Sequence, residues 1–480
     1  MSVLKNYSYN LLYQITLIIL PVLSIPYISR VIGSHGIGVY AFTSSITQYF
    51  LIFANLGLNI YASREIAYVK HDVFKRSKLF TEIIIIQFIV TTIVLFAYYL
   101  YIYSFCRSYA NLYIIQSISI LSMAFDISWF YIGLEDFKKN VIRNIVVKIT
   151  AFVLMFLIIK TPADLWKYIL LSVASMFLGQ LYMWFGIGKF IDKIHLNKLQ
   201  IFQHLYKAKF FFLIITIGVI GVNLNKTLIG LFVNTAELGK YDMAYRLITM
   251  ALIMITSLGS VMTPRISTIY IQGDFLRIKG YLKMSLQFTL LFSFLVIPLL
   301  IGISNNLVHW FLGSQFSGAE LYLILLSPMI LLNSLSNLLA NQFMIPSGNE
   351  KKYLFSLIVG CLMGILSSII LIPKFMVIGA CLSVLIGEST ILLSHIYQVK
   401  NIVMLHNIIG KGWQFIVACL PIILCSLIFK KMIWNTIFMT TIQIIISFLI
   451  YFGVLLMFKN EFLISAISRF RVLFKYRVNI

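Results

Sequence analysis

Residues 80–103 read FTEIIIIQFIVTTIVLFAYYLYIY, an almost wholly apolar run in which Glu82 is the one charged side chain. A helix needs about 20 mostly apolar residues to cross the hydrocarbon core of a bilayer, which is ~30 Å thick. This stretch therefore predicts a helix that spans a membrane.

Similar stretches recur along the whole chain. Short connections separate them, and the longest connection lies around 189–208. The sequence therefore predicts an all-α polytopic membrane protein with about 14 transmembrane helices. The expected spans are 9–31, 37–61, 80–103, 111–133, 141–160, 165–188, 209–233, 243–268, 284–304, 319–345, 354–372, 376–396, 412–429 and 433–457.

The composition excludes a soluble domain. Hydrophobic residues make up 60% of the chain and charged residues 11%, whereas a soluble protein is roughly 25% charged. The formal net charge of +23 does not indicate nucleic-acid binding, because the basic residues are spread over many segments and form no single large patch. The five cysteines lie mostly inside spans without a metal-ligand spacing, which favours buried apolar positions.

The basic residues sort by side of the membrane. Of 38 Lys and Arg, 28 lie at the termini or in even-numbered loops, nine lie on the odd side, and Lys226 lies inside a span. Loops rich in Lys and Arg stay cytoplasmic, so both termini are expected in the cytoplasm. Residues 1–10 carry one Lys and no cleavage pattern, which indicates a retained first helix.

An internal repeat is indicated at an offset of 201 residues. Gly38 and Tyr40 open one span and Gly239 and Tyr241 open another, while Arg64 and Arg265 follow those two spans. Two halves of six helices would point the same way through the membrane, an arrangement typical of rocking transporters. We expect six-helix bundles at 1–200 and 201–400, with two additional helices and a basic cytoplasmic tail at 401–480.

Polar side chains form stripes inside three predicted spans. They are expensive in hydrocarbon, so they line a wet cavity or hydrogen-bond between helices, and the pattern leaves both interpretations open. The candidate cavity residues are Gln48, Asn55 and Asn59 (with Ser44) in the second span, Asn223 in the seventh, and Asn333 and Asn337 (with Asn341) in the tenth.

Charged residues within or beside the spans are candidates for binding a substrate or coupling an ion. Lys226 lies about two-thirds of the way along its span, where it either faces a hydrated cavity or extends to the interface. Arg30 and Arg246 lie at external helix ends, with binding and interfacial anchoring equally open. Asp126 and Glu388 are candidates for coupling a proton or sodium ion, or for structural pairing. The excess of cations suits an anionic ligand.

Catalytic motifs are missing from the sequence. It contains no GxxxxGK[ST] loop, no HExxH and no GxSxG. It also lacks the Asp-rich metal cluster expected of a glycosyltransferase, and no external loop is long enough for a catalytic domain. We therefore expect neither catalysis nor a bound cofactor or metal.

Several segments resemble one family. These segments are Arg30-Val31-Ile32-Gly33 with Gly38-Val39-Tyr40, DISWFYIGLEDFKK at 126–139, LGKY at 238–241, AYRL at 244–247, VMTPR at 261–265, and IPSG at 345–348 before Lys351-Lys352. They are similar to patterns of Wzx-type polysaccharide flippases of the MOP superfamily. The resemblance runs from about 5 to 400, and 126–139 is its most specific part. We interpret the charges of 135–139 as a solvated helix end.

The resemblance implies alternating-access transport of undecaprenyl-diphosphate-linked oligosaccharide to the external leaflet of a bacterial plasma membrane, for capsule, O-antigen or exopolysaccharide. Partners would be membrane lipids and, in the same pathway, polymerase and chain-length proteins. Lys226 would hold the diphosphate. Arg64 and Arg265 would receive it first or brace the inward gate, unless they are ordinary positive-inside residues. The tail Arg469 to Arg477 would anchor to headgroups.

The sequence alone leaves rival functions open. A drug antiporter for organic cations would need more buried carboxylates, and a lipid II flippase would share the same superfamily. A membrane polymerase or acyltransferase would need a large external loop or a buried catalytic cluster. A structural scaffold would gain nothing from charges within its spans.

Overall fold

The computed structural model describes residues 3–192, 200–400, 412–430, 437–465 and 468. This part of the chain is helical throughout, without a β-strand. In chain order the α-helices are α1 (Val3–Asn55), α2 (Leu58–Val69), α3 (Val73–Phe105), α4 (Ala110–Ala124), α5 (Ser128–Gly133), α6 (Phe137–Ile158), α7 (Leu165–Trp184), α8 (Ile201–Phe232), α9 (Thr235–Ile271), α10 (Phe275–Leu307), α11 (Ala319–Leu326), α12 (Met329–Leu339), α13 (Glu350–Val399), α15 (Trp413–Lys430) and α16 (Ile437–Met457).

Ten helical stretches of the described chain are long and apolar enough to cross a membrane. Two of them, Ile19–Val69 and Glu350–Val399, are far longer than one crossing requires. Each covers all or part of two predicted spans. The non-helical Gly33 (φ 75°) lies between the first pair, and the non-helical Met376 (φ 52°) is the first residue of the later span in the second pair. The predicted all-α polytopic fold is confirmed. The start of the last expected span, 433–436, lies outside the described residues.

Three predicted spans, 37–61, 111–133 and 319–345, are interrupted and do not form single continuous helices. The span 37–61 breaks at Leu56 and Gly57, both with positive φ, and the Gly57 backbone lies so close to the backbone of Phe212 that a Cβ would not fit. The span 111–133 breaks between α4 and α5, and the span 319–345 breaks between α11 and α12. Hydropathy does not register these breaks, because the tertiary contacts that stabilise them come from other helices.

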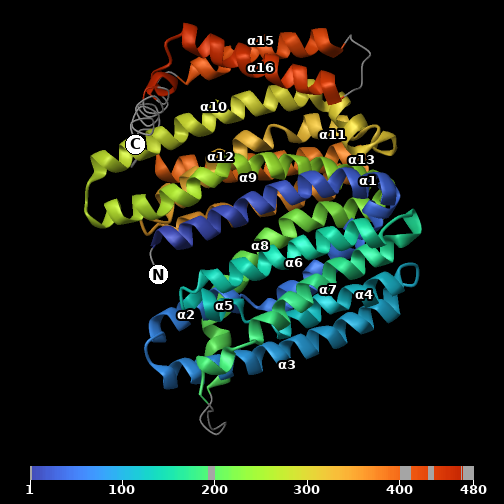
Figure 1. Ribbon diagram of the computed structural model, residues 1–480, viewed down its shortest axis with the longest axis vertical. Coiled ribbons are helices and arrows are strands. Elements are labelled where there is room, and N and C mark those ends of the chain that lie inside the picture. The colour runs from blue at the N-terminus through green and yellow to red at the C-terminus, as the bar shows by residue number, and fades with distance from the viewer. Residues whose placement is uncertain (1–2, 193–199, 401–411, 431–436, 466–467, 469–480) are drawn as a thin grey trace. The chain divides into compact units, whose positions relative to one another are not determined.

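The described helices pack into two compact units, unit 1 (Met1–Gly239) and unit 2 (Lys240–Ile480). Figure 1 shows α3, α4, α6, α7 and α8 among the helices of unit 1, and α10, α12, α13, α15 and α16 among those of unit 2. The repeat boundaries at 200 and 400 stay predictions, since packing and internal repetition are different properties. The tail from Arg469 to Arg477 lies outside the described residues.

The core of unit 1 is built on the segment that carries the family resemblance. Trp129 and Phe130 are fully buried with Phe80 beside them at ring distances of 5.7 and 5.1 Å. Lys139 donates hydrogen bonds to the carbonyl oxygens of Met183 and Phe185, at 3.1 and 2.6 Å. The interpretation of the charges of 135–139 as mainly a solvated helix end is therefore wrong for Lys139, which binds carbonyls at the C-terminal end of α7.

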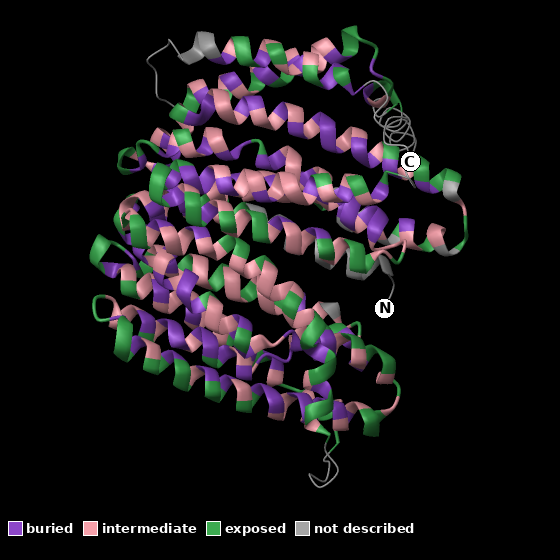
Figure 2. Cartoon of the chain, turned by 180° about the vertical axis from the view of Figure 1, so that it is seen from behind, coloured by how far each residue is buried: buried purple, intermediate pink, exposed green. Residues whose placement is uncertain are grey.

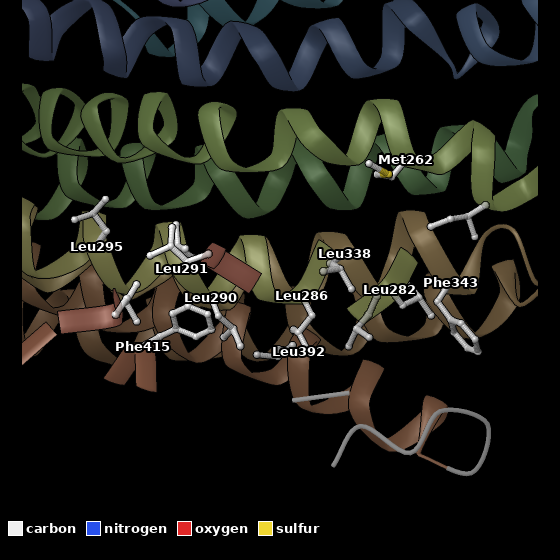
Figure 3. Packing of buried hydrophobic residues seen from close by; sticks show 14 of the residues in the cluster. Met262, Leu282, Leu286, Leu290, Leu291, Leu295, Leu338, Phe343, Leu392 and Phe415 are labelled. Carbon is white, nitrogen blue, oxygen red and sulfur yellow. The ribbon is translucent and has the colours of Figure 1, made fainter. Parts of the chain in front are cut away.

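The core of unit 2 lies along α10. Figure 3 shows Leu282, Leu286 and Leu290 of α10 in one row, with Leu392 of α13 and Phe415 of α15 in the same buried cluster. Exposed residues recur along the outer faces of the helices in Figure 2. Many of them are large and apolar, as expected for faces that lipid covers.

Candidate functional site

Unit 1 contains a cavity of about 350 Å³ between four helices. Its walls come from the second half of α1, from α4, α7 and α8. None of the described side chains that line it is charged. The polar lining residues are Tyr40, Ser44, Thr47, Gln48, Asn55, Gln116, Ser119 and Ser172, and the others are apolar.

One wall of this cavity is fixed by an internal hydrogen-bond network. The Gln116 amide Nε2 donates to Thr43 Oγ1 at 2.7 Å, and Thr47 Oγ1 donates to Gln116 Oε1 at 2.6 Å. The Tyr98 hydroxyl lies 2.8 Å from Thr47 Oγ1. Their hydrogen-bonding groups are therefore used to join α1, α3 and α4, which holds the wall in place.

Other polar groups of the cavity keep their hydrogen-bonding capacity. The side chains of Tyr40, Gln48 and Ser172 make no hydrogen bond among the described residues. Asn55 accepts from the backbone N–H of Gly57 at 3.1 Å through Oδ1, which leaves its amide nitrogen for another partner. Two of the predicted cavity residues, Gln48 and Asn55, thus line a real cavity with groups that can bind a ligand.

Asn59 and Asp126, by contrast, hold the two helix breaks together. Asn59 Nδ2 donates to Asp126 Oδ2 at 2.9 Å, and the backbone N–H of Ser128 donates to Asp126 Oδ1 at 2.9 Å. Asp126 is 4% exposed. Asn59 does not belong to the lining of the cavity, and both carboxylate oxygens of Asp126 have a protein donor.

Lys226, the predicted cation, is a residue of α8, and its neighbour Thr227 contacts α1. The Thr227 hydroxyl lies 3.0 Å from the hydroxyls of Ser45 and Tyr49, while Asn223 donates to the Val219 carbonyl of its own helix at 2.9 Å. Lys226 and Asn223 are half-buried and neither is part of the cavity lining.

None of the predicted arginines is among the described residues that line the cavity. Arg30 is exposed at the end of the first half of α1. Arg64 is exposed on α2, where Nε donates to the Tyr68 hydroxyl at 3.2 Å. Arg265 is exposed on α9 of unit 2. Arg246 of α9 pairs with Asp242, which is fully buried, through Nε and Oδ2 at 2.7 Å.

Unit 2 has its own polar positions among the predicted residues. Asn333 Nδ2 lies 3.2 Å from both carboxylate oxygens of Glu388 and joins α12 to α13. Asn337 lines a gap of about 10 Å³ together with Ser285, Thr289 and Gln342. A gap of this size holds about one water molecule. It is too small for an organic ligand.

Sequence reasoning missed a buried cluster in unit 1. His204 Nε2 lies 2.8 Å from Glu82 Oε2, and His204 Nδ1 lies 2.7 Å from the Tyr61 hydroxyl. Glu82 Oε1 also accepts from the backbone N–H of Gln200 at 2.7 Å. The cluster joins α2, α3 and α8. A Glu close to one end of a predicted span was the signal that could have indicated it.

The described part of the chain holds no group of three or more His, Cys, Asp or Glu side chains placed to bind a metal ion. The five cysteines are free, with Cys106 and Cys381 buried.

Outside the spans, the backbone N–H of Lys75 donates to Asp72, which lowers the pKa of that carboxyl and caps α3.

The chain is similar in sequence to known proteins. A sequence profile of the family described as "Polysaccharide biosynthesis protein" matches residues 3–270. A "Putative O-antigen transporter" of Shigella dysenteriae is 23% identical over 391 residues, covering 79% of this chain and 96% of that protein. A protein of the same name from Escherichia coli (strain K12) is 23% identical over 418 residues, covering 84% and 97%.

Solved structures show the same fold. The lipid II flippase MurJ in an inward closed conformation is similar with a TM-score of 0.74 at 17% identity, covering 95% of this chain and 99% of that one. An inward-facing multidrug resistance MATE family transporter of the MOP superfamily is similar with a TM-score of 0.55 at 12% identity, covering 79% and 96%. At these identities the likeness concerns the fold alone.

Proposed function

Because the chain belongs to the polysaccharide biosynthesis protein family, we propose that it is a flippase for lipid-linked oligosaccharide. It moves repeat units carried on undecaprenyl diphosphate from the cytoplasmic to the external leaflet by alternating access. It acts as a transporter and not as an enzyme. The observation that carries this proposal is the match to O-antigen transporters over almost their whole length.

The fold supports the same function. The chain shares the fold of a solved lipid II flippase, and the substrate that we propose carries a diphosphate and a sugar headgroup. The neutral polar cavity of unit 1 gives such a headgroup a hydrophilic place between helices whose outer faces are apolar. The lipid tail then stays in the bilayer, so only the headgroup has to be transferred.

The diphosphate needs a cation along its route. We assign the central one to Lys226, whose ammonium is compact and binds an anion without a fixed geometry. Arg30 and Arg246 serve the external end, and Arg64 and Arg265 serve the cytoplasmic end, where their exposed side chains are open to the aqueous phase. Few and separated cations suit transport, because a ligand that is held too tightly is not released.

Ion coupling, if the flippase uses it, is assigned to Glu388. Its described hydrogen-bond partner is a neutral amide, that of Asn333, so it can take up a proton or a sodium ion. Asp126 is the weaker candidate of the two, because both of its oxygens already accept hydrogen bonds that hold a helix break.

The cellular setting follows from the same proposal. The chain is a multi-pass membrane protein, and we place it in the bacterial plasma membrane with both termini in the cytoplasm. Its substrate comes from cytoplasmic glycosyl transfer and its product goes to polymerase and chain-length proteins. A capsule, an O-antigen or an exopolysaccharide would be the final polymer.

Depletion of the protein tests the proposal. Repeat units are labelled with a membrane-impermeant reagent, in intact cells and after permeabilisation. The proposal predicts completed units that are protected in intact cells and labelled after permeabilisation. Units that still reach the outside without being polymerised would reject the flippase and favour a polymerase.

A further inference from the structure

The cavity of unit 1 separates its polar groups into two kinds. Gln116 and Thr47 bond to each other, so they build the wall. Tyr40, Gln48 and Ser172 keep hydroxyl and amide groups without a partner among the described residues, and the amide nitrogen of Asn55 is in the same condition. The groups without a described partner include both hydrogen-bond donors and acceptors, and the neighbouring wall of the cavity is held by the bonds of Gln116 and Thr47.

The chemistry of this lining selects its ligand. A diphosphate or a metal ion would lose its hydration here without an opposite charge to replace it, which costs several kcal/mol or more. A sugar hydroxyl is neutral, donates and accepts, and pairs with amides and hydroxyls at little net cost. Apolar lining residues such as Leu51 and Met176 can cover the C–H faces of a sugar ring.

The volume of the cavity limits the size of the ligand that it can hold. At about 350 Å³ it lies near the lower end of the ~300–1,000 Å³ range of small-molecule sites, which leaves room for roughly one or two sugar rings. The aromatic ring of Tyr40 is held by an edge contact with Tyr168 at 5.3 Å. The site is therefore small and neutral.

We propose that this cavity is a carbohydrate subsite, which takes a neutral sugar of the headgroup while the diphosphate stays outside it. The inference rests on the proposed flippase function and deepens it, because it assigns recognition of the sugar to unit 1 alone. Gln48 and Tyr40 are its principal hydrogen-bonding groups.

The test measures binding to the full chain in lipid nanodiscs with two probes, undecaprenyl diphosphate and undecaprenyl-diphosphate N-acetylglucosamine. The wild type should bind the sugar-bearing lipid more tightly. Gln48→Leu and Tyr40→Phe should each weaken that binding about fivefold per lost hydrogen bond and leave binding of the bare lipid unchanged. Thr92→Val is the matched control, since its exposed hydroxyl bonds to the Phe88 carbonyl of its own helix.

Each outcome separates the subsite from the function. If the cavity variants weaken both lipids equally, or neither, the carbohydrate subsite is rejected while the flippase stands. If the wild type binds neither lipid and depletion leaves translocation intact, the proposed function itself fails. A third probe that carries glucuronic acid should bind no better than the bare lipid, and tighter binding of this acidic sugar would contradict the neutral character of the site. Thermal unfolding of each variant identifies a loss of binding caused by misfolding, and Asn55→Leu then replaces a variant that does not fold.

Discussion

Gly38 and Gly239, which are 201 residues apart, pack backbone against backbone. A Cβ placed on Gly38 would lie 3.0 Å from the amide nitrogen of Gly239 and would overlap the carbonyl oxygen of Thr235. A Cβ on Gly239 would overlap the carbonyl oxygen of Ser34. The two glycines that carry the repeat in the sequence therefore meet each other in the structure. Each allows the other helix to approach, so neither is replaceable on its own.

We expect Gly38→Ala and Gly239→Ala to destabilise the protein, each by about 1–3 kcal/mol, because the added methyl group overpacks a backbone contact. Thermal unfolding in detergent, followed by the monodisperse fraction, measures the loss. Gly218→Ala is the control, since nothing lies within 4 Å of its Cβ and Ala favours a helix interior by roughly 0.5–1 kcal/mol. Equal stability of the Gly38 and Gly218 variants would contradict this packing.

The cluster of Glu82, His204 and Tyr61 should stabilise unit 1 substantially. Glu82 and His204 are only 4% and 7% exposed, so Glu82→Ala leaves a buried imidazole without its acceptor. We expect a loss of about 1.5–3 kcal/mol for Glu82→Ala and about 1 kcal/mol for Tyr61→Phe. Thermal unfolding again provides the measurement.

The control for this cluster is Lys75→Ala. Lys75 forms an exposed ion pair with Asp72 at 3.2 Å, and such pairs contribute about 0–1 kcal/mol. A Glu82 variant as stable as the Lys75 variant would show that the buried pair contributes nothing measurable.

Asp126 and Asn59 provide a third prediction. Asp126→Ala removes the acceptor for both Asn59 and the Ser128 N–H, so we expect a loss of about 1–3 kcal/mol. Asp126→Asn keeps an acceptor oxygen for Ser128 and should be milder in unfolding measurements. The same variant should retain translocation in the impermeant-label assay. A well-folded Asp126→Asn protein without transport would instead favour the ion-coupling role.

The sequence is sufficient to predict the helices but not the places where they break. Long apolar runs identify the spans by their hydropathy alone. The breaks at Gly57 and Asp126 depend on contacts with Phe212 and Asn59, which come from other segments. The stripe from Gln48 to Asn59 is continuous in the sequence, yet the break at Leu56 separates Asn59 from the cavity.

Only some of the polar residues that line the cavity could be predicted from the sequence. Gln48 and Asn55 stand out as amides in an apolar span. Tyr40 and Ser172 do not, because a single Tyr or Ser in a span is an ordinary residue until the fold brings it to a cavity. His204 likewise lies 122 residues from Glu82 in the chain, and no spacing rule links the two.

Glu388 should control any dependence of transport on an ion gradient. Glu388→Gln keeps an acceptor oxygen for Asn333 and removes the charge, so the fold should persist while the gradient dependence is lost. Translocation is measured in proteoliposomes with and without a pH or sodium gradient. Glu350→Gln, at the exposed first turn of α13, is the control. If a gradient drives the Glu388→Gln protein as strongly as the wild type, coupling does not pass through this residue.

Lys226 should govern the diphosphate and not the sugar. Lys226→Met keeps a similar length and apolar stem but removes the ammonium group, so binding of undecaprenyl diphosphate in nanodiscs should weaken by about tenfold or more, as expected for loss of a charge-assisted hydrogen bond. The preference of the protein for the sugar-bearing lipid should stay unchanged, because Lys226 does not line the cavity. Lys352→Met, an exposed residue of α13, is the matched control. Unchanged binding of the bare lipid by the Lys226 variant would move the diphosphate site to the arginines at the helix ends.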